Sequence, residues 1–228
     1  MTAPKGGYFG KVLEVDLSKG EIKTRELSDE TARKFIGGSG LGAYYLTSEY
    51  KAHHDPWAED SFLFIGPGPL NGTFCPSTRA SFVNQSVHTG LISHAEVGGH
   101  FGNEIKWAGW DGIYIKGKSK KPVWLSIKDD KVEIRDASKM WGKDTETAEE
   151  MILKEMKDPY ARTAVIGPAG ENMIPYAAVI VERTRAAART STGALMGNKK
   201  LKAISVRGTK AVPTVDPAKF TEAAKLSL

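Results

Sequence analysis

Apolar and polar residues alternate along residues 8–17 and 21–27, on either side of a Ser-Lys-Gly turn. A period of two places successive side chains on opposite faces of a strand, so this pattern predicts a β-hairpin. The same pattern returns at 123–127 and 131–135, across a Lys-Asp-Asp turn. We therefore predict two hairpins, each at the beginning of one half of the chain.

Helical patterns follow each hairpin. Ser28 or Asp29 is a suitable N-cap for a short helix that ends at Ile36, where a glycine-rich stretch at 37–42 is expected to break it before a second helix at 41–50. The helix expected near 145–156 is better defined, because acidic residues in its first turn and lysines near its end complement the helix dipole. Short helices are also expected at 103–108 and 193–201, after glycines.

The remaining apolar runs predict short strands at 62–65, 79–84, 112–116, 164–166, 176–181 and 203–206, whereas 87–99 is expected to be a loop or irregular. Residues 8–118 and 122–210 thus contain the same parts in the same order, including an Ile-Gly-Pro turn, an arginine segment and a Gly-Asn helix start. We predict an α+β fold with two antiparallel β-sheets, a pseudo-twofold internal duplication and flanking helices. Such a fold suits a ligand made of two similar halves.

The end of the chain has a different character. Residues 1–210 are expected to form one domain, and Val-Pro-Thr-Val at 212–215 resembles a linker. Asp216 and Pro217 then predict a helix start. Phe220, Ala223, Ala224 and Leu228 begin an apolar face. We expect residues 211–228 to be a linker and the start of a helix that belongs to a following domain or a partner.

Composition narrows the class of protein. The 228 residues are 40% hydrophobic and 26% charged, as is usual for a soluble globular chain. Cys75 is the single cysteine, which excludes an internal disulfide and a cysteine-only metal or iron–sulfur site within this sequence. It also fits a reducing, cytoplasmic location. No run approaches the roughly 20 apolar residues of a membrane span. The net charge of +5 is spread among acidic residues, which argues against nucleic-acid binding.

Three tempting motifs fail on context. Residues 112–119 match GxxxxGK[ST], but their centre is strand-like and a further strand follows, whereas a phosphate loop needs a helix there. Gly38, Gly40 and Gly42 resemble a dinucleotide fingerprint that lacks a βαβ frame. The five histidines cluster within 53–100 without zinc-motif spacing, so we interpret them as ordinary surface or hydrogen-bonded residues, although His94 and His100 flank a candidate binding segment.

Two arginine segments remain as candidate binding chemistry. One segment combines Arg79 with Glu96, Gly98 and Gly99. The other runs from Arg185 through three alanines to Arg189 and is followed by Gly193. A guanidinium binds phosphate bidentately, glycines let backbone amides approach the same oxygens, and a carboxylate with a backbone carbonyl can hold Mg²⁺ between phosphates. The alternative is that both arginines form surface ion pairs.

Several long motifs then occur in an order that resembles the N-terminal domain of the tungsten-containing aldehyde:ferredoxin oxidoreductases. These motifs are GPGPLNGT at 66–73, GGHFGNEIKWAGWD at 98–111, VEIRDASKMWGKDT at 132–145, IGPAGEN at 166–172, RAA at 185–187 and GALMGNKKLKAI at 193–204. The resemblance implies a base that binds a tungsten bis-pterin whose two phosphates are bridged by magnesium. It also implies later helical domains.

The resemblance assigns expected roles to individual residues. It implies that Arg79 and Arg185 contact the pterins, that Gly98 and Ala188 offer backbone contacts, and that the carbonyl of Ala186 binds magnesium. Gly99 belongs to the same backbone segment as Gly98. Two departures stand out. Glu96 occupies the place of the family's asparagine cation ligand, and the family's Arg-Gly-Gly reads Arg-Thr-Ser at 189–191.

The implied reaction is the oxidation of an aldehyde to a carboxylic acid, with electrons passed to ferredoxin or a partner subunit. The family's 4Fe–4S cysteines and proton-transferring residues lie in later domains, so this segment alone is expected to be inactive, with no catalytic residue of its own. Molybdenum is the alternative metal. A non-catalytic subunit that completes its site with a separate helical iron–sulfur chain is the alternative function, and a plain nucleotide-binding module is disfavoured by the failed motifs.

Overall fold

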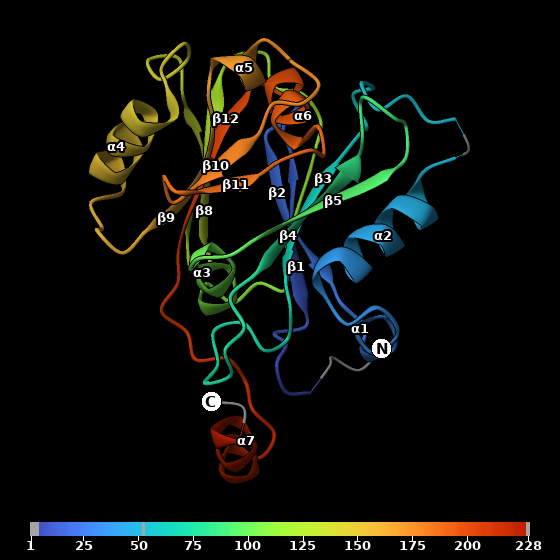
Figure 1. The fold of residues 1–228 in the computed structure, drawn as a ribbon, viewed down its shortest axis with the longest axis vertical. Helices are drawn as coiled ribbons and strands as arrows, with labels where there is room; N and C mark the ends of the chain where they lie inside the picture. The colour runs from blue at the N-terminus through green and yellow to red at the C-terminus, as the bar shows by residue number, and fades with distance from the viewer. Residues whose placement is uncertain (1–4, 52, 227–228) are drawn as a thin grey trace.

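The fold is built from two six-stranded sheets, one from each half of the chain (Figure 1). The computed structural model describes residues 5–51 and 53–226. In spatial order, the first sheet contains β2 (Glu21–Glu26), β1 (Lys11–Asp16), β6 (Ile113–Lys116), β3 (Leu63–Pro67), β4 (Ala80–Gln85) and β5 (Ile92–Val97). The second contains β8 (Lys131–Asp136), β7 (Val123–Lys128), β12 (Leu201–Arg207), β9 (Arg162–Ile166), β10 (Val179–Val181) and β11 (Arg185–Ala187).

Corresponding strands occupy the same places in both sheets, which confirms the internal duplication. Strand directions also agree in the two sheets. β1 pairs with β6 and β7 pairs with β12 in parallel, while the other neighbouring strands in the described residues pair antiparallel. The α+β class is therefore confirmed, and each sheet is mixed rather than wholly antiparallel. The parallel pair arises because the last strand of each half returns through a helix to lie beside the first strand.

Helices cover the outer faces of the sheets and fill the ends. Those in the described part of the chain are α1 (Asp29–Phe35), α2 (Gly38–Glu49), α3 (Phe101–Trp107), α4 (Thr145–Met156), α5 (Pro168–Glu171), α6 (Thr192–Asn198) and α7 (Pro217–Lys225). Ser28, Asp144 and Asp216 cap α1, α4 and α7 by accepting backbone N–H groups, as their positions in the sequence indicate. None of the helices within 5–51 and 53–226 has the length and apolar character needed to traverse a bilayer.

The glycine-rich stretch at 37–42 behaves differently from the expectation. It was expected to separate two helices as a turn, but Gly38, Gly40 and Gly42 form the first turn of α2. A Cβ at Gly42 would lie 2.5 Å from the Cβ of Val83 on β4. The glycines are therefore needed for close packing of helix on sheet, which overrides their low helix propensity.

A continuous apolar core joins the two halves. Leu13, Phe82 and Ile105 from the first half belong to the same buried cluster as Leu125 and Ile204 from the second. Smaller clusters lie under α2 and under α4, on the outer faces. Because burial of apolar surface is the main stabilising term in folding, the shared core fixes one half against the other.

The edge strands β5 and β11 were missed by the sequence analysis, which expected 87–99 to be irregular. In β5, Ala95 and Val97 face the core, while Ile92, His94 and Glu96 are exposed. This alternation is short and carries polar residues, as is common where a strand has a neighbour on one side only. Helix α7 projects away from the sheets at the base of the molecule (Figure 1). Leu228, assigned to its apolar face, lies outside the described residues.

Candidate functional site

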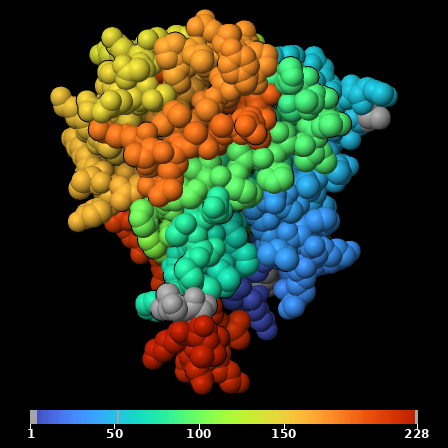
Figure 2. Space-filling model, in the orientation of Figure 1, coloured from blue at the N-terminus to red at the C-terminus, as the bar shows by residue number. Residues whose placement is uncertain are grey.

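The candidate site is a groove between the two edge strands, β5 and β11, which lie side by side (Figure 1). Figure 2 shows the same face, where orange residues of the second half meet green residues of the first. The groove has a volume of about 540 Å³ and is lined by residues 92–96, Ala186, Ala188, Arg189 and Thr190. Each strand is the last of its sheet, so its outer edge presents backbone N–H and C=O groups that no sheet neighbour uses.

Glu96 is held at this groove by a buried hydroxyl. Ser81, on the neighbouring strand β4, donates a hydrogen bond of 2.5 Å to Glu96 Oε1. Ser81 is itself buried, and a Cβ at Gly38 would lie 2.7 Å from its Oγ. One carboxylate oxygen is therefore fixed from within the protein, while the Glu96 side chain is exposed at the groove.

The side chain of Arg185, the first residue of β11, extends from the second half of the chain and lies against Gly98 and Gly99 of the first half. A Cβ at Gly98 would lie 3.4 Å from Arg185 Nη1, and a Cβ at Gly99 would lie 3.1 Å from both Cδ and Nε. Gly99 also has a φ of +99°, which only glycine adopts readily. The guanidinium is exposed, and within the described residues it has no hydrogen bond or ion pair.

The backbone of Arg79 lies next to the same glycine segment. It immediately precedes β4, and the pairing of Ala80 with Val97 places its backbone beside Gly98. Its side chain is exposed and, in the part of the chain that the structure describes, lacks an ion pair or hydrogen bond. The structure thus brings Arg79 and Arg185 to one glycine segment.

The two arginines are nevertheless not equivalent by the duplication, and that expectation is wrong. Ile65 pairs with Phe82, and the matching Ile166 pairs with Val179, so Arg79 corresponds to Tyr176, which is 80% exposed. The same register makes Arg185 the counterpart of Ser93 on β5. The arginine segments look alike in sequence, but they come from different strands of the repeated unit.

Glu182 is a site-adjacent residue that the sequence analysis missed. Its Oε1 accepts hydrogen bonds from the backbone N–H groups of His100 at 2.6 Å and Phe101 at 2.7 Å, at the start of α3. The same oxygen would lie 2.9 Å from a Cβ at Gly99. A carboxylate from the second half therefore fixes the Gly99 turn in the first half. No local pattern signals a contact across so many residues.

The other motifs find structural explanations. Strand β6 runs through the centre of the phosphate-loop pattern at 112–119, which confirms its rejection. His54 bonds to Gln85 at 3.0 Å and to Asp60 at 3.1 Å and stacks on Tyr50. Among the described residues there is no group of three or more His, Cys, Asp or Glu side chains placed to hold a metal ion. His94 is the histidine that lines the groove.

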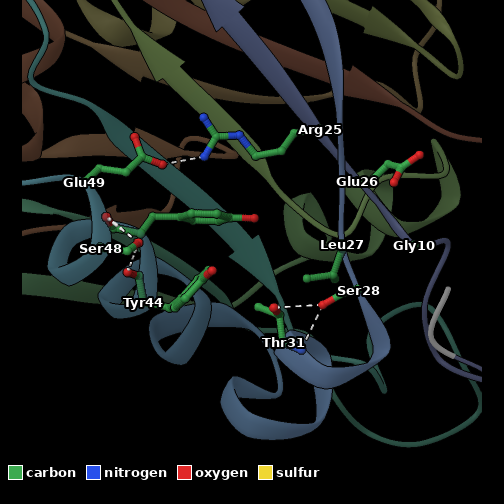
Figure 3. Close-up of a pocket in the computed structure, with 10 residues that line it drawn as sticks. Gly10, Arg25, Glu26, Leu27, Ser28, Thr31, Tyr44, Ser48 and Glu49 are labelled. Carbon is green, nitrogen blue, oxygen red and sulfur yellow. Dashed lines mark hydrogen bonds and ion pairs between the residues drawn. The ribbon is translucent and has the colours of Figure 1, made fainter. Parts of the chain in front are cut away.

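A second cavity, of about 370 Å³, lies between β2 and the helices α1 and α2 (Figure 3). Its polar groups bond mainly to one another. Arg25 donates to Glu49 at 2.5 Å and to Glu14 at 2.7 Å, and Ser28 accepts from the N–H of Thr31. Burial raises the pKa of Tyr45, in the same wall, to about 12. Arg79 and Arg185, which lie beside the groove but are not among its lining residues, differ from Arg25 in having no side-chain partner within the described residues.

Comparison with known proteins places the chain in a family. The family model "Aldehyde ferredoxin oxidoreductase, N-terminal domain" matches residues 12–208. A tungsten-containing aldehyde ferredoxin oxidoreductase of Thermococcus kodakarensis is 48% identical over 215 residues, which cover 94% of this chain and 36% of that protein. The aliphatic sulfonate oxidoreductase WOR-like subunit of Pyrococcus furiosus is 37% identical, covering 91% of this chain and 36% of that protein.

A solved structure agrees with these relatives. It is the active site complex BamBC of benzoyl coenzyme A reductase, with a TM-score of 0.94 and 37% identity, covering 97% of this chain and 34% of that one. The chain spans about a third of the length of the proteins that it matches. By the extent of the family match and the identity to these relatives, the chain belongs to the aldehyde ferredoxin oxidoreductase family and corresponds to its N-terminal domain.

Proposed function

We propose that this chain is the cofactor-binding base of a tungsten bis-pterin oxidoreductase, and that the groove between β5 and β11 holds the cofactor. The observation that carries the proposal is that the side chain of Arg185 lies against Gly98 and Gly99, while the backbone of Arg79 lies beside Gly98. Among the described residues, neither arginine side chain has a hydrogen bond or ion pair. Unpaired guanidinium groups at a concave surface are suited to bind phosphates.

The residues present fit an anionic group with two phosphate arms. Arg79 and Arg185 supply two forked cations, Gly98 and Gly99 leave room for close approach to the backbone, and the strand edges offer further hydrogen bonds. Ala188 lines the groove on β11's side and would contribute backbone contacts. When bound, the metal–pterin group supplies the redox chemistry, and the protein positions it and balances its charge.

Glu96 and Ala186 are proposed to bind the magnesium between the phosphates. Both residues line the groove. Glu96 would offer its carboxylate and Ala186 its carbonyl. Magnesium prefers oxygen ligands and commonly combines one or two protein oxygens with phosphate oxygens and waters. Since Ser81 fixes Glu96 Oε1, the other carboxylate oxygen is the one available to the cation.

The aldehyde is the substrate class that the comparisons favour. Four tungsten-containing aldehyde ferredoxin oxidoreductases share 45–48% identity with this chain, whereas the sulfonate enzyme and the benzoyl coenzyme A reductase share 37%. We propose oxidation of an aldehyde to a carboxylic acid, with electrons leaving through a 4Fe–4S cluster in other domains or a partner chain to ferredoxin. Residues 1–210 would be the cofactor domain, and 211–228 would lead toward those domains. A cytoplasmic location fits this chemistry.

A second candidate is a non-catalytic subunit that completes its cofactor site with a separate helical iron–sulfur chain. The names of two relatives favour it, because one is called a subunit and the other an active site complex. The two candidates differ in whether the native protein carries the iron–sulfur cysteines in the same polypeptide. Mass spectrometry of the intact native protein and its copurifying chains distinguishes them.

The experiment that tests the cofactor proposal replaces Arg79 or Arg185 by glutamine in the native protein. Tungsten measured by elemental mass spectrometry and pterin measured after extraction should both fall relative to protein, while the fold is retained. Arg33→Gln is the matched control, because Arg33 is an exposed arginine whose 2.7 Å contact with Asp29 lies within α1. Unchanged tungsten and pterin in both groove variants would refute the assignment.

A further inference from the structure

We infer that Arg189 is a third cofactor-binding arginine, which a buried polar network between the two halves holds at the groove. The inference rests on the proposed function, because it concerns the same anionic ligand. Arg189 lines the groove together with Glu96 and Ala186. Its side chain is exposed, and within residues 5–51 and 53–226 it forms no hydrogen bond or ion pair.

The backbone of this segment adopts a conformation that its residues rarely take. Arg189 has a φ of +66° and Ser191 a φ of +62°. Left-handed backbone is uncommon for residues other than glycine, and when the surrounding structure enforces it, functional sites are a frequent place. The conformation turns the chain directly after β11, where Arg189 meets the groove.

Buried hydrogen bonds from the first half enforce the turn. Asn84, on β4, donates from Nδ2 to the carbonyl of Thr190 at 2.9 Å, and its Oδ1 accepts from Thr192 Oγ1 at 2.8 Å. Thr190 and Thr192 bond to each other at 2.7 Å, and Ser86 bonds to Ser191 at 3.1 Å. These side chains are all buried, so each hydroxyl is satisfied inside the protein.

The network also occupies the two polar residues that follow Arg189. The hydroxyls of Thr190 and Ser191 bond to Thr192 and Ser86. The two side chains are thus committed to the contact between the halves. Within residues 189–191, the side chain of Arg189 is therefore the polar one that is available to a ligand.

The duplication shows that Arg189 adds charge to one side of the groove. Ala187 pairs with Val179 as Ala95 pairs with Phe82, so Arg189 corresponds to Val97, which is buried in the core. The second half therefore brings Arg185 and Arg189 to the ligand, whereas the first half brings Arg79 and the carboxylate of Glu96. This asymmetry suits a ligand whose two anionic arms share one cation on the Glu96 side.

The test is Arg189→Gly in the native protein. Glycine adopts the observed φ without strain, so the variant removes the guanidinium while the turn is preserved or made more stable. The loaded protein is diluted into buffer that contains a chelator. The amounts of tungsten and pterin released from the protein are then measured over time. We expect release at least about tenfold faster than from the parent, the factor that corresponds to one lost hydrogen bond to a charged group. The thermal midpoint of the metal-free protein should not fall.

Arg33→Gln is the control and should release tungsten at the parent rate. Release from Arg189→Gly at the parent rate would overturn the inference, and so would a fall in the thermal midpoint of the metal-free variant, because the arginine would then be structural. A parent that contains no tungsten, molybdenum or pterin would refute the proposed function itself. Faster release from Arg185→Gln but not from Arg189→Gly would leave the proposed function standing and remove Arg189 from it.

Discussion

Substitution of Gly99 by alanine tests how the two halves build the site. Gly99 has a φ of +99°, and a Cβ there would lie 2.9 Å from Glu182 Oε1 and 3.1 Å from Arg185 Cδ and Nε. Both neighbours come from the second half. The methyl group of an alanine at this position would therefore crowd the Glu182 carboxylate, which accepts hydrogen bonds at the start of α3, and also the side chain of Arg185. Gly20 is the matched control, because its φ is +68° and nothing lies within 4 Å of the corresponding Cβ.

The expected magnitudes differ between the two glycines. Left-handed backbone costs about 1–2 kcal/mol for a residue with a Cβ, and this is the whole effect expected for Gly20→Ala. In Gly99→Ala, Glu182 must also withdraw from one or both of its backbone hydrogen bonds to His100 and Phe101. A hydrogen bond to a charged group contributes about 1.5–3 kcal/mol, so with one such bond lost the total should reach about 2.5–5 kcal/mol.

Two assays on the same preparations decide the matter. Denaturant unfolding should show a larger drop in the free energy of unfolding for Gly99→Ala than for Gly20→Ala, and tungsten content should fall in Gly99→Ala only. Equal loss of stability in the two variants, with tungsten retained in both, would show that Glu182 and Arg185 do not depend on the Gly99 turn.

Three further outcomes follow from the structure. Burial lowers the pKa of Lys199 from its usual 10.5 to about 7. Between these two pH values the unfolded chain binds more protons than the folded chain, so the free energy of unfolding should rise with pH across that window. Lys199→Met should remove this contribution, which a difference plot of parent and variant unfolding against pH would reveal; parallel curves would contradict it. Gly197→Ala should lower the free energy of unfolding by about 3 kcal/mol or more, because its Cβ would lie 1.8 Å from Gly170 O between α5 and α6; unchanged urea unfolding would disprove this tight packing. Glu96→Ala should weaken magnesium binding in the cofactor-loaded protein, as measured by magnesium content after dialysis, and full retention would exclude Glu96 as a ligand.

Local patterns in the sequence predicted the local elements well. The hairpins, the caps at Ser28 and Asp216, and the strand through the false phosphate loop all follow from periodicity and end signals that a short segment carries by itself. The order of these elements also indicated the duplication, since each half repeats its parts in sequence.

Long-range features were not predictable in the same way. Whether β5 and β11 are strands depends on their neighbours, because each lies at the edge of its sheet and is paired on one side only. The equivalence of Arg79 with Tyr176 depends on strand register, which a list of motifs in order does not contain. The role of Glu182 depends on the packing of one half against the other. These features emerge when the shared core is assembled.

The candidate residues illustrate the same division. The resemblance singled out Glu96, Ala186 and Ala188, and the structure places all of them along one groove. In the sequence, Arg189 only marks the end of the second arginine segment. Its significance comes from the bonds of Asn84, Thr190 and Thr192, which join residues that are distant in sequence.

The central claim is that the cofactor lies between β5 and β11, beside Gly98 and Gly99. Crystals of the native protein, with diffraction data collected on both sides of the tungsten L3 absorption edge, locate the metal directly. The account predicts a tungsten-specific anomalous peak that faces this groove, with phosphate density within hydrogen-bonding distance of Arg79 and Arg185. A tungsten peak on another surface, such as the cavity around Arg25, with both groove arginines in contact with solvent alone, would contradict it.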